Sequence, residues 1–262
     1  MSNSLKIVKY SFYDTFRSSW AILYFLFFLL ITGGLFYFSA DFSQSIPSLL
    51  NVILFIVPLV SIVFGTIYYY NSREFALLLM TQPMKRFQLF LGQYLGLSSS
   101  LALSFVAGTS VVFVFFGADP DAIPLLVMLL GSGIFLTFIF TAIAFAVSIH
   151  HDDRTKGFGV SILIWLFALV IYDGIFLVIL FVFEDYPLEN VAIAMTMLNP
   201  VDLSRIMVLL NLETAALMGY TGAVFNKFFG TTKGVLISVL VQVAWVILPL
   251  FIYLRKAKNK DF

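Results

Sequence analysis

Six apolar runs, each about twenty residues long or longer, recur along this chain of 262 residues and constrain its fold more than any other feature. They cover residues 20–38, 48–70, 88–116, 124–149, 158–183 and 234–254. A helix of about twenty apolar residues crosses the hydrocarbon core of a bilayer. Only 11% of the residues are charged and 61% are hydrophobic, whereas about a quarter of an ordinary soluble domain is charged. The sequence therefore predicts an all-α membrane protein with six transmembrane helices in a single domain, 1–262.

The basic residues are divided unequally between the two ends of the predicted bundle. Twelve lie on the side of the termini: Lys6, Lys9, Arg17, Arg73, Lys85, Arg86, Arg154, Lys156, Arg255, Lys256, Lys258 and Lys260. The other side has Arg205, Lys227 and Lys233. Because loops rich in Lys and Arg stay in the cytoplasm, this asymmetry predicts a multi-pass protein with both termini cytoplasmic.

Several functional classes conflict with the composition. A net charge of +1 does not suit a nucleic-acid partner, and the chain has no cysteine to form a disulfide or a thiolate site. It contains no GxxxxGK[ST] phosphate loop, HExxH or GxSxG motif. We therefore expect no cofactor and no catalytic residues in this chain.

Residues 3–19 are predicted to form an amphipathic helix in the membrane interface. Leu5, Val8, Phe12 and Phe16 make an apolar stripe at helical spacing, with basic and aromatic residues beside it. The alternative is a frayed cytoplasmic tail.

A second non-spanning region, 71–87, is predicted to be a short helix on the cytoplasmic face. Phe75, Leu78 and Leu79 give it an apolar face, and Pro83 ends it. Charges flank it at both ends: Arg73, Glu74, Lys85 and Arg86. Such a helix can dock in a groove of a soluble partner, and the alternative is an interfacial turn.

The outer segment 184–233 is too apolar for a plain loop and too interrupted to cross the membrane. A helix over 188–198 is expected to end before a second one, which Asn199 caps and Pro200 opens. Asp202 and Arg205, three residues apart, are expected to pair on its surface. The pattern predicts two short interfacial or re-entrant helices.

One acidic residue, Asp173, lies within the fifth span. A charge at mid-membrane costs roughly 2.5–3.5 kcal/mol. It is interpreted either as a polar point on a substrate path or at the dimer seam, or as a structural aspartate. The structural aspartate would be protonated, or hydrogen-bonded to a group such as Tyr172 or a serine or threonine of a neighbouring span.

Two groups of residues raise the question of metal binding. Met195, Met197, Met207 and Met218 lie in the outer segment, and thioethers suit Cu(I), although packing against apolar surroundings is the alternative. His150, His151, Asp152 and Asp153 form the loop after the fourth span, where a metal site competes with a solvated turn or a partner contact.

The run REFALLLMTQPMKRFQLFLGQYLG resembles the coupling-helix signature of ABC-2-type transporter permeases. Glu74, Leu78, Pro83, Arg86 and Gly92 carry the match. Phe75-Ala76 replaces the usual glycine-threonine, and Gln93 replaces the usual lysine. The resemblance implies a non-catalytic permease in an ATP-driven complex, in which 71–87 couples to a separate ATPase that binds ATP and Mg²⁺.

A narrower resemblance, to the NosY family of permeases, is carried by MLNPVDLSRIMVLLNL and an acid in the fifth span. The matching residues are Asn199, Pro200, Asp202, Arg205 and Asp173. This resemblance implies a homodimer on two ATPase subunits in the bacterial inner membrane, a periplasmic β-helix partner, and a role in copper-site maturation of nitrous oxide reductase. The alternatives are an ABC-2 exporter of lipid, glycan or drug, a gliding-motility permease, or, from a different class, an ATP-independent scaffold or intramembrane enzyme.

Overall fold

The computed structural model describes residues 3–38, 42–80, 85–116, 123–183, 188–210, 225 and 227–260, without the side chains of 3–5, 42–44 and 116. These ranges are helical and contain no strand. The elements in chain order are α1 (Asn3–Phe16), α2 (Ser19–Phe38), α3 (Phe42–Asn71), α4 (Arg73–Met80), α5 (Arg86–Phe116), α6 (Ile123–His150), α7 (Arg154–Leu166), a π-helical turn η2 (Phe167–Ile171), α8 (Tyr172–Val182), α9 (Glu189–Leu198), α10 (Pro200–Leu209) and α12 (Thr232–Asn259).

The six predicted spans are confirmed in the described part of the chain. Six segments are long and apolar enough to cross a membrane: Ser19–Phe38, Ser45–Asn71, Arg86–Phe115, Ile123–His150, Arg154–Val182 and Thr232–Asn259. The fifth consists of α7, η2 and α8 in succession. Each differs from the sequence-based range by only a few residues, because the apolar composition that defines a span also sets its length.

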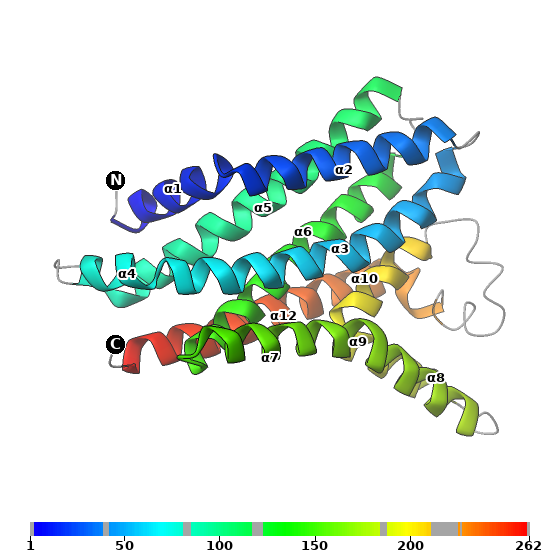
Figure 1. The fold of residues 1–262 in the computed structure, drawn as a ribbon. Helices are drawn as coiled ribbons and strands as arrows, with labels where there is room; N and C mark the ends of the chain where they lie inside the picture. Colours follow the sequence, from blue (N-terminus) through cyan, green and yellow to red (C-terminus); the bar gives the residue numbers. More distant parts are fainter. Residues whose placement is uncertain are drawn as a thin grey trace.

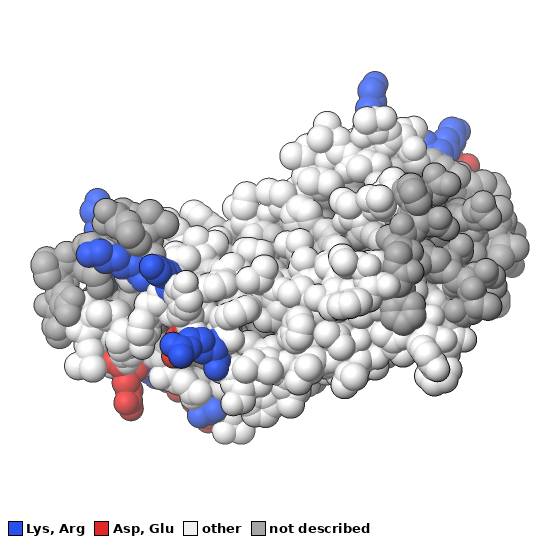
Figure 2. Space-filling model, turned by 90° about the horizontal axis from the view of Figure 1, so that it is seen from above, with Lys and Arg blue, Asp and Glu red and all other residues white. Residues whose placement is uncertain are grey.

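Both termini and α4 lie at one end of the bundle, called here the near end (Figure 1). The opposite end is the far end. Figure 2 shows Lys and Arg gathered toward the two ends of one face, with an uncharged band between them. Such a band suits the hydrocarbon core, where ionised side chains are costly.

The central helix is α6, which packs against α3, α5, α7, α10 and α12. Its Phe145 forms edge-to-face ring contacts with Tyr94 and Tyr253. Glycines permit close helix approach: a Cβ added to Gly65 on α3 would lie 2.7 Å from Ala144 Cβ on α6. Small residues at helix contacts are the usual means of close packing between transmembrane helices.

The N-terminal helix α1 packs along α5 through a face other than the apolar stripe that the sequence predicts for the membrane interface. Its buried side chains are Ile7, Ser11 and Thr15, whereas Phe16 is 40% exposed. The reason is a glycine surface on α5: a Cβ on Gly92 would lie 2.7 Å from Ile7 Cγ2, and one on Gly96 would meet Ser11 Cβ. Close approach therefore selects the face with the small serine and threonine.

The two short helices α9 and α10 follow each other directly in the chain and are bent by 116° relative to each other at Asn199. The predicted helices over 188–198 and from Pro200 onward are thus present. The second, α10, contacts α3, α6 and α12. Leu203 and Ile206 of α10 pack with Ala192 of α9 and with Phe225 and Phe229 in an apolar cluster.

Candidate functional site

The first candidate site is a polar cluster of Asn199, Asp202, Arg205 and Asp173, called here the Arg205 cluster. As predicted, Asn199 caps α10: its side chain accepts from the Val201 N–H at 3.1 Å, and Pro200 occupies the first turn. Pro suits that position because its fixed φ matches the helix and its missing N–H has no intrahelical partner there.

Arg205 joins two carboxylates from different helices. Its Nη1 donates to Asp202 Oδ1 at 2.8 Å and to Asp173 Oδ2 at 2.9 Å. The predicted Asp202–Arg205 pair is confirmed, but it is not a surface pair, since the Asp202 side chain is only 5% exposed. Asp173 has a partner that neither interpretation from the sequence named. An acid within a span needs a compensating charge, and Arg205 is one of only three basic residues assigned to the outer side.

Asn199 also connects the cluster to the π-helical turn of the fifth span. Its Nδ2 donates to Asp202 Oδ2 at 2.9 Å and to the carbonyl of Ala168, inside η2, at 2.7 Å. Short π-helical turns recur at functional sites. The turn is bonded to α10 through Asn199, and Asp173, the second residue of α8, is bonded to α10 through Arg205.

Three further residues fix the bent pair, and the sequence did not single them out. Gln242 Nε2 of α12 donates to Ser204 Oγ on α10 at 3.0 Å, and the Trp245 indole N–H donates to the Met197 carbonyl at 3.2 Å. Ser204 in turn donates to the Pro200 carbonyl at 2.8 Å. The sequence signal for these contacts is the presence of a glutamine and a tryptophan in an otherwise apolar span. Buried polar groups are normally hydrogen-bonded, so each of the two side chains indicates a polar partner on another helix.

Asn199→Ala is expected to lower the free energy of unfolding by about 1–2 kcal/mol, the usual cost of a lost helix cap. Asn199→Asp is the matched variant, because it keeps the capping acceptor and removes the donor to Ala168 and Asp202. The midpoint of unfolding in an SDS titration of the purified protein measures the stability of both variants. An unchanged midpoint for Asn199→Ala would contradict the assigned cap.

Asp173→Asn is expected to leave expression normal and to impair the ATP-coupled function that the resemblance to ABC-2-type permeases implies. Arg205 keeps Asp202 as its partner in this variant, so folding survives, while the charge link to the fifth span is lost. Asp173→Glu, which keeps the charge, is the control. Membrane expression together with ATP-dependent activity of the complex measures the effect, and full activity of Asp173→Asn would contradict it.

The methionines lie around the same bent pair. Met195 and Met197 are on α9 and Met207 is on α10, all partly buried. The Met197 side chain packs in the apolar cluster of α9 and α10, as the packing alternative expects, and copper binding stays a prediction. Met218 lies outside the described residues. Within those residues, no group of three His, Asp or Glu side chains is placed to hold a metal ion.

The second candidate site is at the near end, where Asp152 joins α4 to α12. Asp152 Oδ1 accepts from Arg73 Nη2 at 3.2 Å and from Lys260 Nζ at 2.9 Å. Lys260 Nζ also donates to the Ile149 carbonyl at 2.7 Å, and Arg86 Nη1 donates to the Lys260 carbonyl at 2.9 Å. We call Arg73, Asp152, Lys260 and Arg86 the near-end cluster.

The short helix α4 starts at this cluster, at Arg73. Ala76 is buried, and Leu79 and Met80 pack with Ile7 of α1 and Leu89 of α5. Leu78 is 69% exposed, so the apolar residues expected to form one face are divided between the protein and the surroundings. Glu74 and Lys85 are exposed, and Pro83 lies outside the described residues.

The loop before α7 is an ordered turn. Asp153 caps α7 by accepting from the Thr155 N–H at 2.8 Å. The Nδ1 atoms of His150 and His151 lie 2.7 and 2.9 Å from the carbonyls of Ala146 and Val147. Because a carbonyl only accepts, each Nδ1 carries a proton. The turn expected from the sequence is therefore present, and the metal site stays an alternative from the sequence.

The near-end cluster is expected to hold α4 in a pH-dependent way. The hydrogen bond and charge of Lys260, followed by the charge of Arg73, lower the pKa of Asp152 below its usual value. A depressed pKa means that the interaction is present above the ordinary aspartate pKa of about 4 and is lost as the pH falls through the lower, folded-state value. A spin label at Leu77→Cys should therefore become more mobile at acidic pH.

Asp152→Asn should give the mobile α4 signal already at pH 7 and remove this pH dependence. Glu74→Gln, on α4 itself, is the matched neutralisation and should retain it. Equal label mobility in the Asp152→Asn variant and the parent at pH 7 would contradict the assigned role.

No family model matches the chain. Two curated proteins are similar to it over most of their length, and both are named as a probable ABC transporter permease protein NosY. The protein from Pseudomonas aeruginosa is 26% identical over 223 residues, which cover 79% of this chain and 81% of the relative. The protein from Stutzerimonas stutzeri is 25% identical over 237 residues, covering 81% and 83%. The resemblance identified from the sequence is confirmed, and together with the six apolar spans it supports a membrane permease subunit rather than an enzyme.

Proposed function

We propose that this permease transmits ATP-driven motion from a separate ATPase, bound at the near end, to the α9–α10 pair. The observation that carries the proposal is that one helix, α12, connects the near-end cluster with the α9–α10 pair. Lys260, directly after α12, holds the near-end cluster, while Gln242 and Trp245 of the same helix hold α10 and α9. The helix runs from Thr232 to Asn259 with Pro249 inside it, so a displacement at its end reaches both contacts through the helical turn that this proline weakens.

In this proposal α4 is the coupling helix and the near end is cytoplasmic. The near end carries most of the basic residues, as the positive-inside rule requires of a cytoplasmic side. Leu78 and Phe75 are exposed there, on a helix whose first residue is held by Asp152. An ATPase that binds this face displaces α4, and Asp152 passes the displacement to Lys260.

The bent pair α9–α10 is proposed to be re-entrant from the outer side. Backbone that leaves the helical path at membrane depth is tolerated where protein groups satisfy it, and Asn199, Ser204 and Trp245 supply such contacts. The fifth span supports a homodimer, since no residue in its most apolar window is buried within one chain. Exposed apolar surface on the first and fifth spans then faces a second copy or lipid.

The biological setting that we propose is copper-site maturation of nitrous oxide reductase in the bacterial inner membrane, with a periplasmic β-helix partner. Support comes from the NosY resemblance and from the Asn199-Pro200, Asp202 and Arg205 arrangement that carries it. The complex then transmits mechanical work to its outer partner or passes a solute, while the ATPase binds ATP and Mg²⁺.

Co-purification from native membranes through a C-terminal tag, with mass identification of the partners, tests this proposal. Recovery of an ATPase together with a periplasmic β-helix protein is the expected result. An ATPase alone would replace the maturation role with a general ABC-2 exporter, and no ATPase would overturn the proposal.

A further inference from the structure

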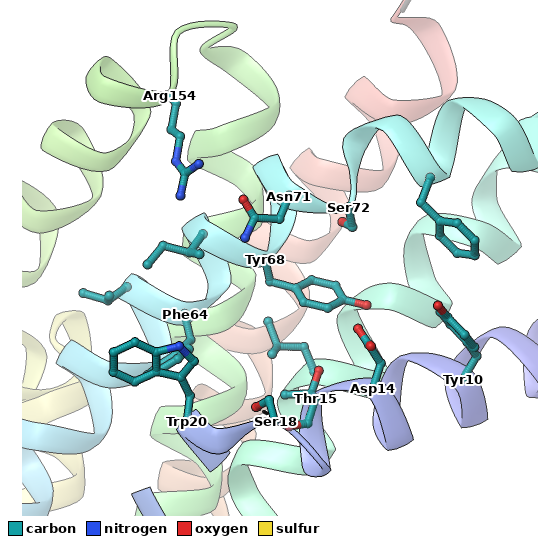
Figure 3. Close-up of a pocket in the computed structure, with 14 residues that line it drawn as sticks. Tyr10, Asp14, Thr15, Ser18, Trp20, Phe64, Tyr68, Asn71, Ser72 and Arg154 are labelled. Carbon is teal, nitrogen blue, oxygen red and sulfur yellow. Dashed lines mark hydrogen bonds between the residues drawn. The ribbon is translucent and has the colours of Figure 1, made fainter. Parts of the chain in front are cut away.

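A cavity of about 730 Å³ opens at the near end between α1, the start of α2, and α3, and it reaches α7. Its volume lies within the range of small-molecule sites, roughly 300–1,000 Å³. Polar residues line it on two sides, with Tyr10, Asp14 and Thr15 on one and Arg154 on the other, and Trp20 and Phe64 add an apolar wall (Figure 3). Such a division suits an amphiphile.

The two charged side chains of the wall have opposite signs. Asp14 comes from α1 and Arg154 from the start of α7. Among the described residues, neither forms an ion pair, whereas Arg73, Arg205 and Lys260 all do. The cavity thus offers a cation and an anion that the protein does not neutralise within one chain, which complements a zwitterionic ligand.

Hydroxyl groups lie beside the carboxylate. Figure 3 shows the Tyr68 hydroxyl directed toward Asp14, with Tyr10 next to them. Thr15 is buried, and its Oγ1 has no hydrogen-bond partner among the described residues. Buried hydroxyls are usually bonded, so a ligand with N–H donors would satisfy Thr15 as well as Asp14. The ring faces of Tyr10 and Tyr68 also suit a cation.

The apolar part of the cavity continues onto the exposed surface of α2. Trp20 is 62% exposed and packs edge-to-face on Phe64, with ring centroids 5.7 Å apart. Leu23 and Leu30 extend the apolar surface along the helix, 59% and 69% exposed. Tryptophan and tyrosine concentrate at membrane interfaces, so the cavity is placed where head groups meet acyl chains.

We propose that this cavity binds one phospholipid whose head group carries a phosphate and a primary ammonium, as phosphatidylethanolamine does. Arg154 pairs with the phosphate, Asp14 and Thr15 accept from the ammonium, and the acyl chains lie on α2 beyond Trp20. A quaternary ammonium has no N–H to donate, and a head group without a cation leaves Asp14 unpaired. The site goes beyond the proposed function and does not depend on ATPase binding.

Native mass spectrometry of the purified full chain, with equal amounts of phosphatidylethanolamine, phosphatidylcholine and phosphatidylglycerol of identical acyl chains, tests the site. The parent should retain phosphatidylethanolamine preferentially. Arg154→Gln should lower its retention by about tenfold, since bonds to charged groups contribute at least that factor. Asp14→Asn should abolish the preference over phosphatidylcholine, and Lys156→Gln, outside the cavity, should behave as the parent.

Equal retention of the three lipids by the parent, or an unchanged preference in Asp14→Asn, would overturn the proposal. If Arg154→Gln fails to fold, the retention of phosphatidylethanolamine relative to phosphatidylcholine in Asp14→Asn still tests the proposed site. A second copy is the competing occupant, and the chain's lack of cysteine permits a direct check with Ser18→Cys. A disulfide between two Ser18→Cys chains that forms with loss of the bound lipid would also overturn it.

Discussion

Arg205→Met is expected to destabilise the protein by about 3 kcal/mol, the largest effect of any substitution considered. Arg205 is the shared partner of Asp202 and Asp173, and its removal leaves two carboxylates without a cation. Breaking a fully buried pair costs about 3–5 kcal/mol. The lower figure applies here because the Arg205 and Asp173 side chains are 31% and 30% exposed.

SDS titration of the purified protein, followed by tryptophan fluorescence, measures this loss. Adding Asp173→Asn and Asp202→Asn to Arg205→Met should recover much of the stability, because the uncompensated charges are then gone. Arg255→Met, an exposed cation on α12, is the control and should be neutral. A midpoint for Arg205→Met equal to that of the parent would show that the cluster does not stabilise the fold.

Leu78→Asp is expected to weaken ATPase binding by about thirtyfold while the permease still folds. Leu78 is 69% exposed in the second half of α4, so a charge there causes little strain within the chain. Burying the same charge in a docking groove would cost at least 2 kcal/mol, the size of an interface hot spot. The dissociation constant for the ATPase in lipid nanodiscs measures the effect.

Asn259→Asp, exposed at the end of α12, adds the same charge at the same end of the bundle and serves as the control. It should bind the ATPase as the parent does. Equal weakening by both substitutions would indicate a general charge effect at the near end. Undiminished binding by Leu78→Asp would place the ATPase contact away from α4.

Local features of the fold were predictable from the sequence. Each span depends on its own apolar composition, and the start of α10 depends on the adjacent residues Asn199 and Pro200. The Asp202–Arg205 pair was predictable for the same reason, since a spacing of three residues places both on one helix face. These are properties of a short stretch of chain.

Long-range pairings were not predictable, because they depend on how the helices pack. Asp173 and Arg205 are 32 residues apart, and Asp152 and Lys260 are 108 apart, on elements whose rotation the apolar pattern does not determine. The face of α1 that packs on α5 was not predictable for a related reason: it depends on the glycines of α5, which accept Ile7 and Ser11. Nothing in the composition of residues 167–171 marks a π-helical turn.

The central claim is that ATP-driven motion at α4 reaches α9. The reactivity of a cysteine placed at the end of α9 tests it most directly. The chain has no native cysteine, and Leu198, the last residue of α9, is 64% exposed. The modification rate of Leu198→Cys by a membrane-impermeant maleimide would be measured in the complex with and without ATP. The proposal predicts an ATP-dependent rate that disappears in the Leu78→Asp background. A rate that ATP does not change, in a complex with ATPase bound and hydrolysing, would contradict it.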